Sequence, residues 1–225
     1  MPSLDDLARA FAAVTTNQLL LGLLFSVAVV MLFGDWRFSL LALAAQYIFV
    51  AILLSTLIPL QIAAVRMIAG GLVATMFYIT ARRVKPRRRR QLAPDEQYRD
   101  YRDEIGQGVF WMNMPFRIIA LALVALSVIA LSGQFVLLNA PTLFWVTGLW
   151  LALGGLVTIA LTRDALKLGM GLLFFTSGFG IIYLSIDNSL LIYALLVISD
   201  LVIALAISHI ASVPAHASGR RRGEV

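Results

Sequence analysis

The chain has 225 residues, of which 60% are hydrophobic and 13% are charged, and its formal net charge is +6. A water-soluble fold of this length could not bury so much apolar surface, so the composition excludes a soluble protein and predicts an all-α polytopic membrane protein. Cysteine is absent, which excludes disulfides, iron–sulfur clusters and thiolate metal sites.

About seven apolar runs are as long as a membrane-crossing helix requires, which is about 20 residues. The first run follows a start that carries Asp5 and Asp6 in place of basic residues, so we expect it to stay in the membrane and not to be a cleaved signal peptide. Pro59 separates the second run from the third. The predicted transmembrane helices lie at 17–34, 37–58, 60–81, 116–138, 142–162, 166–186 and 189–211.

The connections between these runs predict the orientation. The segment 82–115 is rich in arginine and should be cytoplasmic. Counting outward from it, Arg37, Arg163 and the basic tail fall on the same side, whereas the connections near 139–141 and 187–188 contain no Lys or Arg. The N-terminus is therefore expected outside and the C-terminus in the cytoplasm. Basic residues in these places orient a membrane protein, so we expect no nucleic-acid partner.

The same basic segment divides the chain into parts. Helices 1–3 and 5–7 run in the same sense, and each triplet has a basic turn after its first helix, which hints at a parallel internal duplication. The run at 82–90 is expected to meet anionic lipids, although it could instead dock a soluble partner. The predicted parts are three N-terminal helices (1–81), a basic cytoplasmic linker (82–115), a four-helix part (116–213) and a basic tail (214–225).

Asp200 is the clearest ionisable residue inside a predicted span. It lies about ten residues into the last run, so it should be about 15 Å deep, near the middle of the bilayer. A carboxylate facing lipid at this depth would cost several kcal/mol, so Asp200 should face protein or a water-filled cavity. A group that can exchange a proton there is what a proton path needs. The alternative is an aspartate that holds helices together.

Three further residues within or near the spans are candidates for a role in the membrane. Arg66 is about two turns inside the third run, where it could snorkel as an interfacial anchor or join a charge relay. Lys167 could pair with Asp164 at the surface or begin a polar route inward. His209 could be an interfacial residue or a proton carrier. The predicted proton-path residues are Asp200, Lys167, Arg66 and His209. No catalytic, cofactor or metal site is predicted.

The sixth run is rich in small residues, and Gly171 and Gly178 share one helical face. Such residues permit close contact between helices. They also permit a bend or a π-bulge.

Residues 148–211 combine an apolar helix, a short basic turn, a helix rich in small residues, a short outer loop and a helix with one buried acid. This pattern resembles the small three-helix K subunit of respiratory complex I and its relatives in cation/proton antiporters. The segment SDLVIALAI places Asp200 where the family has the acid of its last helix, whereas Leu173 stands where the family has a second buried glutamate. With its additional helices, the chain resembles component E of group-4 membrane-bound hydrogenases and formate hydrogenlyases, which have a basic residue near the place of Arg66.

The resemblance implies a membrane-arm subunit of a complex I-like or hydrogenase-type assembly in the cell (inner) membrane of a bacterium or archaeon. Such a subunit would contribute to proton or sodium translocation along a central polar axis, coupled to electron transfer. Its partners would be antiporter-like subunits and the quinone or hydrogenase module, and it would have neither a redox cofactor nor a catalytic site of its own. The alternatives are a non-transporting scaffold in the same kind of assembly and a free-standing transporter or membrane enzyme.

Overall fold

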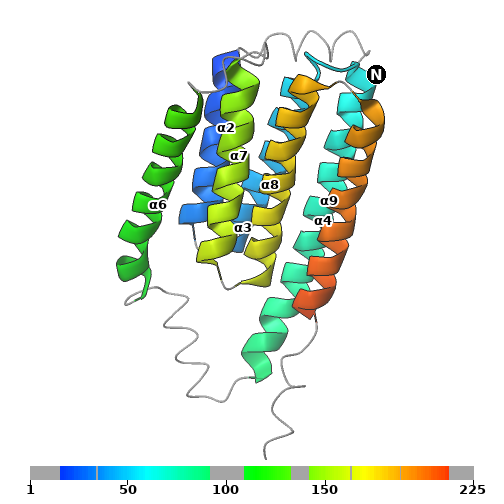
Figure 1. Ribbon diagram of the computed structural model, residues 1–225. Coiled ribbons are helices and arrows are strands. Elements are labelled where there is room, and N and C mark those ends of the chain that lie inside the picture. Colours follow the sequence, from blue (N-terminus) through cyan, green and yellow to red (C-terminus); the bar gives the residue numbers. More distant parts are fainter. Residues whose placement is uncertain are drawn as a thin grey trace, which may run out of the picture.

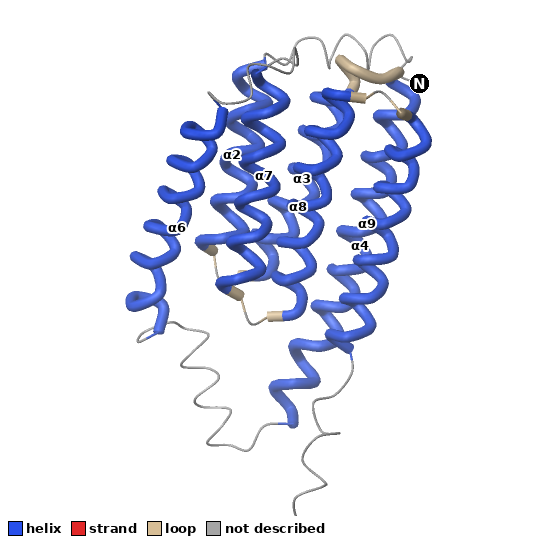
Figure 2. Tube along the Cα trace, viewed as in Figure 1, coloured by secondary structure: helices blue, strands red, loops and turns tan. Residues whose placement is uncertain are grey.

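The computed structural model describes residues 16–33, 35–91, 109–132, 142–162, 164–187 and 189–212, and every element in these ranges is an α-helix (Figures 1 and 2). The all-α prediction is therefore confirmed. The helices are α2 (Thr16–Leu32), α3 (Trp36–Leu54), α4 (Leu60–Gln91), α6 (Val109–Ser132), α7 (Thr142–Leu161), α8 (Ala165–Ile186) and α9 (Leu190–Ser212).

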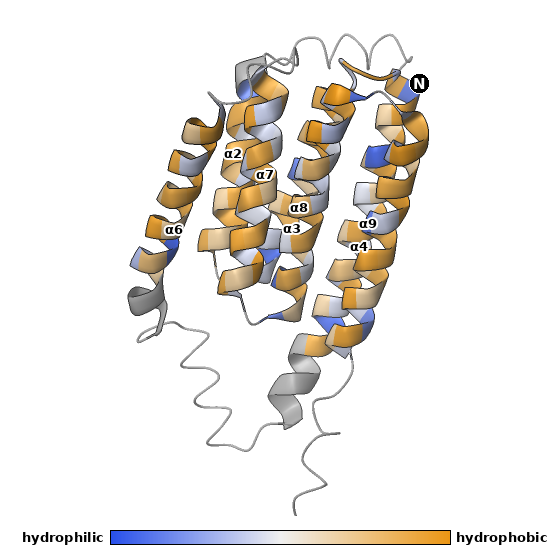
Figure 3. Ribbon diagram, viewed as in Figure 1, coloured by the Kyte–Doolittle hydropathy of each residue, from blue (hydrophilic) through white to orange (hydrophobic). Residues whose placement is uncertain are grey.

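Six of the described helices are long and apolar enough to cross a membrane. The apolar stretch of α2, Gln18–Leu32, is shorter than these six. Apolar residues cover the helices along most of their length (Figure 3). Because water could not solvate such surfaces, the chain is a multi-pass membrane protein.

Two rows of three helices make up the body of the bundle. One row is α2, α3 and α4, and the other is α7, α8 and α9. The rows face each other through the contacts of α2 with α7, α3 with α8, and α4 with α9, and α6 packs on α7 and α2 at one edge (Figure 1). The rows are the two triplets for which the sequence hinted at a duplication. Each middle helix begins at an aspartate that caps it, Asp35 for α3 and Asp164 for α8.

Basic side chains gather at one end of the bundle. The connections from α2 to α3 and from α7 to α8 lie at the end where α4 finishes, which is the lower end in Figure 1. The parts of the helices on this side contain Arg37, Arg82, Arg117 and Lys167. This clustering agrees with the predicted topology, and the assignment of this end to the cytoplasm stays a prediction from the positive-inside rule. Arg163, the N-terminus and the basic tail lie outside the described residues.

Three of the helices differ in their bounds from the predicted ones. The third helix does not end at 81, because α4 continues to Gln91, and the start of the predicted linker is therefore helical. Arginine and lysine are good helix formers, so the helix extends past its apolar part, Leu60–Val84. The second helix ends at Leu54, before the predicted 58. The Ser55 and Thr56 hydroxyls donate to backbone carbonyls of the last turn, and Pro59 disfavours helix at the residue before it.

The fourth helix also begins before its predicted start at 116. The apolar residues that precede Pro115 extend α6 back to Val109. Its predicted end at 138 lies outside the described residues, as do the rest of the basic linker (92–108) and the tail. The described side chains of the basic run at 82–90 stop at Val84, with Arg82 and Arg83 exposed.

Helices α7 and α8 touch through glycine. A Cβ atom added to Gly155 would lie 2.5 Å from the carbonyl oxygen of Gly171, and one added to Gly171 would lie 2.9 Å from that of Gly155. Gly178 faces Gly148 in the same way. Because α8 is α-helical without interruption from Ala165 to Ile186, the packing interpretation of its glycines is confirmed and no π-bulge is present in this helix.

Candidate functional site

Asp200 lies inside the bundle, where α9 meets α3, α4 and α8. Its side chain is 1% exposed, so the prediction that it faces protein and not lipid is confirmed. Tyr47 donates a hydrogen bond of 3.1 Å to Oδ2, and Thr176 donates one of 2.7 Å to Oδ1. Nη2 of Arg66 lies 3.5 Å from Oδ2. The carboxylate is therefore held by one cation and two hydroxyl groups.

Arg66 is buried with Asp200. Its guanidinium is 2% exposed and donates a hydrogen bond of 2.6 Å to the Ser177 hydroxyl. It also lies over the Tyr47 ring, 5.3 Å from the ring centroid, which adds a cation–π contact. An interfacial anchor would keep its charge in water or headgroups, so the snorkelling interpretation of Arg66 is wrong.

The ion pair joins the two rows of helices. Arg66 and Tyr47 come from the first row, whereas Asp200, Thr176 and Ser177 come from the second. Tyr47 follows the capping Asp35 by the same number of residues as Thr176 follows the capping Asp164. The two hydroxyl donors therefore occupy equivalent places in the two triplets.

Gly70 allows Tyr47 to reach its place. It lies one turn after Arg66 on α4, and a Cβ atom added there would collide with the Tyr47 side chain. With glycine at this position, the ring packs directly against the α4 backbone and its hydroxyl reaches Asp200. A larger residue would displace the donor.

Other polar groups are also buried inside the bundle. The Tyr193 hydroxyl lies close enough to the Arg66 guanidinium to interact electrostatically, but it makes no hydrogen bond of good geometry within the described residues. Gln46, the neighbour of Tyr47 on α3, is fully buried. Its amide oxygen and nitrogen both lack a hydrogen-bond partner within the described residues. The sequence prediction missed Tyr47, Gln46 and Tyr193, although a Gln-Tyr pair inside the apolar α3 was a detectable signal.

The other predicted path residues lie elsewhere. Lys167 donates a hydrogen bond of 2.7 Å to the Phe33 carbonyl at the end of α2. It sits in the first turn of α8, about 13 Å along the helix from Thr176, so it does not reach the ion pair. His209 is exposed in the last turn of α9, about 13 Å along the helix from Asp200. Leu173, where the family that the sequence resembles has a glutamate, is a fully buried apolar side chain.

In comparisons with known proteins, the chain matches no protein-family model, no curated protein and no solved structure. The chemistry of the site must therefore indicate its role. A carboxylate and a guanidinium in a low-dielectric interior attract each other strongly, and neighbouring hydroxyl groups can donate or accept protons. Such an arrangement can either hold helices together or take part in proton exchange.

Replacement of Thr176 by valine should weaken the bundle by about 1.5–3 kcal/mol, because the variant keeps the side-chain shape but removes a hydrogen bond to a buried charge. Thermal unfolding in detergent measures this loss. Thr75→Val is the matched control, since Thr75 is exposed and its hydroxyl bonds only to the Gly71 carbonyl of its own helix. Equal melting temperatures for the two variants would contradict the role given to Thr176.

Proposed function

We propose that the chain is a membrane-arm subunit of a complex I-like or hydrogenase-type assembly and helps to carry protons or sodium ions along a polar axis inside the membrane. Its partners are antiporter-like subunits and a quinone or hydrogenase module. The observation that carries the proposal is the buried ion pair of Arg66 and Asp200. Asp200 is the exchanging group, and Arg66 sets its charge.

The burial of the pair supports this function. Charges inside a membrane are expensive and are found mainly where they serve transport or a proton relay. Proton exchange at Asp200 requires its contact with Arg66 to loosen, which links the protonation of one row to its packing against the other. Coupled transport needs a link of this kind between charge and structure.

Buried polar groups inside the bundle supply a route for protons. The Gln46 amide, Nε of Arg66 and the Tyr193 hydroxyl are buried and lack hydrogen-bond partners among the described residues. Buried groups of this kind normally bond to ordered water. In the proposed mechanism, internal water bound to these polar groups carries protons to and from Asp200. The other two predicted path residues, Lys167 and His209, lie nearer the basic end of the bundle.

The test must remove the titratable group without leaving a lone charge. Asp200→Asn alone would leave the Arg66 guanidinium buried without a counterion, and it would impair assembly for that reason. The double variant Arg66→Gln/Asp200→Asn removes both charges but keeps hydrogen-bonding side chains. The assembly is purified from native membranes through a tag on this chain, its subunits are identified, and ion uptake per electron transferred is measured in proteoliposomes.

We expect the double variant to assemble and to transfer electrons while ion uptake per electron falls at least tenfold. A matched control, Arg82→Gln/Asp187→Asn, makes the same chemical changes at exposed positions and should pump normally. Ion uptake at the wild-type ratio in the Arg66→Gln/Asp200→Asn variant would refute transport through Asp200. Purification of the chain without antiporter-like or redox subunits would refute the assembly.

One observation favours a second function, a non-transporting scaffold in the same kind of assembly. Leu173 provides an apolar core residue where the family that the sequence resembles has a glutamate, and the Asp200 carboxylate finds its partners within the chain. Replacement of a buried ion pair by apolar residues often leaves stability unchanged or raised. A scaffold therefore predicts that Arg66→Leu/Asp200→Leu assembles and pumps at the wild-type ratio, whereas a transporting subunit predicts an assembled complex that no longer pumps.

A further inference from the structure

The polar groups of the ion pair continue toward one end of the bundle. Tyr193 lies in the first turn of α9, at the end opposite the basic end and about 10 Å along the helix from Asp200. Both side chains belong to the buried face of α9. The Tyr193 hydroxyl interacts electrostatically with the Arg66 guanidinium, which in turn contacts Asp200. Polar groups therefore connect Asp200 to a residue about 5 Å from the start of α9.

Two groups on this stretch keep hydrogen-bonding capacity. The Tyr193 hydroxyl and Nε of Arg66 are buried and lack a hydrogen-bond partner among the residues that the structure describes. The side chains of both residues are only 2% exposed. Buried polar groups of this kind normally bond to water. Water that enters at the start of α9 therefore meets the Tyr193 hydroxyl before it meets the ion pair.

In the opposite direction, apolar side chains separate the ion pair from the basic end. Residues 168–175 of α8 and 201–207 of α9, which follow the pair in this direction, are all apolar. A Cβ atom added to Gly169 would lie 2.7 Å from the Ile207 side chain and 2.9 Å from the Phe77 side chain, so α4 and α9 meet on α8 there. Phe77 is fully buried and Ile207 is 7% exposed. This apolar contact lies about 10 Å along α9 from the ion pair.

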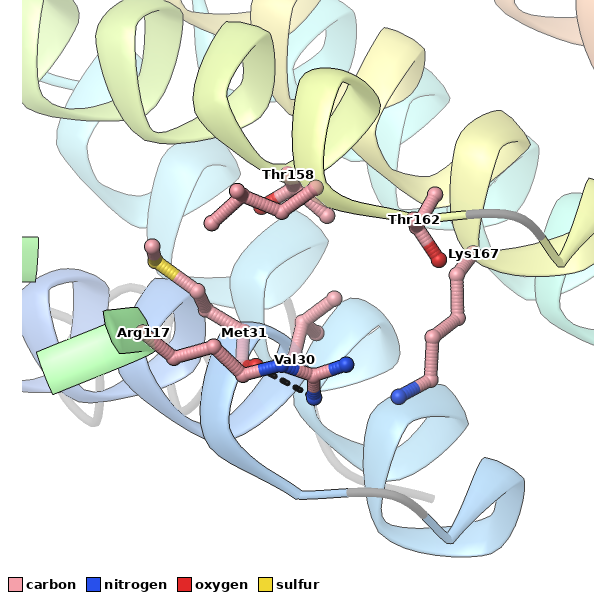
Figure 4. Close-up of a pocket in the computed structure, with 7 residues that line it drawn as sticks. Val30, Met31, Arg117, Thr158, Thr162 and Lys167 are labelled. Carbon is pink, nitrogen blue, oxygen red and sulfur yellow. Dashed lines mark hydrogen bonds between the residues drawn. The ribbon is translucent and has the colours of Figure 1, made fainter. Parts of the chain in front are cut away.

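The basic end has a hollow of its own, but the lining of this hollow does not include the ion pair. The hollow lies between α2, α6, α7 and α8, and the Arg117 and Lys167 side chains line it (Figure 4). Its space is about 10 Å³, which is room for about one water molecule. None of its lining residues belongs to α3, α4 or α9, the helices that provide Tyr47, Arg66 and Asp200. Water in this hollow is therefore still separated from the pair.

We infer that water reaches the Arg66–Asp200 pair from only one end of the bundle, the end opposite the basic residues, and that the Tyr193 hydroxyl is its point of entry. The apolar contact of Phe77 and Ile207 closes the other direction, as hydrophobic constrictions do when they exclude water. The inference deepens the proposed function and rests on it for one statement, that Asp200 exchanges protons with that end. The entry of water itself is a property of the chain whether or not the chain pumps.

The test uses the absence of cysteine from the chain. Ser177→Cys places a single thiol beside the pair, because the Ser177 hydroxyl accepts the 2.6 Å hydrogen bond from Arg66. Membrane vesicles of both orientations that contain the full chain are treated with silver ions, which are small and bind thiolates, at one face at a time. The thiols that remain are quantified by alkylation and mass spectrometry. We expect silver to react at least tenfold faster from the end opposite the basic residues.

Controls identify the face that silver reaches and the role of the hydroxyl. Asp187→Cys and Arg83→Cys place thiols at exposed positions at the two ends of the bundle, and each should react from one face only. Tyr193→Phe in the Ser177→Cys background removes the polar group at the point of entry and should slow the reaction at least fivefold. Tyr183→Phe is the matched control, since the Tyr183 hydroxyl bonds to Asp187 at an exposed position, and it should leave the rate unchanged.

The apolar contact is tested in the same background. Phe77→Ala should open it and speed the reaction from the basic face at least tenfold. Because this variant removes a large core side chain, the smaller truncation Ile207→Ala is made as well and should change the rate in the same direction.

Equal rates from the two faces, or a faster rate from the basic face, would overturn the inference. So would the absence of reaction from either face in a protein whose exposed thiols react normally. A one-sided reaction that Tyr193→Phe leaves unchanged would overturn the role of the Tyr193 hydroxyl. Because silver access is measured without electron transfer, its outcome is separate from the pumping of the Arg66→Gln/Asp200→Asn variant, which tests the proposed function.

Discussion

An Arg66→Leu variant should lose about 3–5 kcal/mol of stability, because Asp200 would remain buried without its cation. The cost of an uncompensated buried charge exceeds what the apolar leucine side chain returns in packing. The loss should appear as a large drop in the midpoint of reversible unfolding in mixed micelles. Arg82→Leu is the control, since Arg82 is exposed and lies over the Tyr78 ring at the end of the span.

The second substitution, Asp200→Leu, should rescue the first. The double variant Arg66→Leu/Asp200→Leu contains no buried charge and should recover more than half of the lost stability. Recovery should be incomplete because the Tyr47 hydroxyl loses its acceptor, whereas the Thr176 hydroxyl can donate instead to the Leu173 carbonyl, 3.1 Å away. A double variant no more stable than Arg66→Leu would show that the two residues do not act as a pair.

Replacement of Gly178 by alanine should separate α7 from α8. The added Cβ atom would meet the Gly148 carbonyl oxygen and lie 2.5 Å from the Ala152 backbone nitrogen, and neither can move without shifting a helix. Overpacking of this kind costs about 1–3 kcal/mol. The expected result is a lower melting temperature in detergent, with part of the loss offset by the better helix propensity of alanine.

Gly180→Ala is a control on the same helix with the same chemical change. Its Cβ atom would lie 3.4 Å from a flexible Leu196 methyl group, which is ordinary van der Waals contact. This variant gains the same helix propensity without a backbone clash, so it should be at least as stable as the wild type. A Gly178→Ala protein as stable as the Gly180→Ala protein would contradict direct backbone contact between α7 and α8.

Hydrophobicity made the helices predictable, because a membrane-spanning helix needs a long apolar run and has no competing local structure. The ends were less predictable. Hydroxyl groups at Ser55 and Thr56 finish α3 early, and the arginine-rich continuation of α4 stays helical beyond its apolar part. Hydropathy measures solubility in lipid and carries no information on where a polar helix segment stops.

The depth of Asp200 was predictable, but its partner was not. Distance along each helix placed Arg66 nearer the outer surface than Asp200, and nothing in either segment indicates which helices are neighbours. The contact of α4 with α9 settles that Arg66 faces inward, and packing of the two rows brings Tyr47 and Thr176 to the same carboxylate. Lys167 was a reasonable candidate by charge alone, yet its ammonium group donates to the Phe33 carbonyl at the end of α2, away from the ion pair.

The Arg66–Asp200 contact also has a consequence for biosynthesis. Helix α4 enters the membrane before the ribosome has made α9, and at about 5–20 residues per second the delay lasts roughly 7–27 s. During this time the guanidinium has no carboxylate to meet. An arginine costs about 2.5–3.5 kcal/mol at the centre of an inserting helix, and Arg66, about two turns from the start of the span, bears part of that cost. Nascent α4 must therefore wait beside the translocon or let its arginine reach for headgroups, and it settles at its final depth only when the last helix arrives.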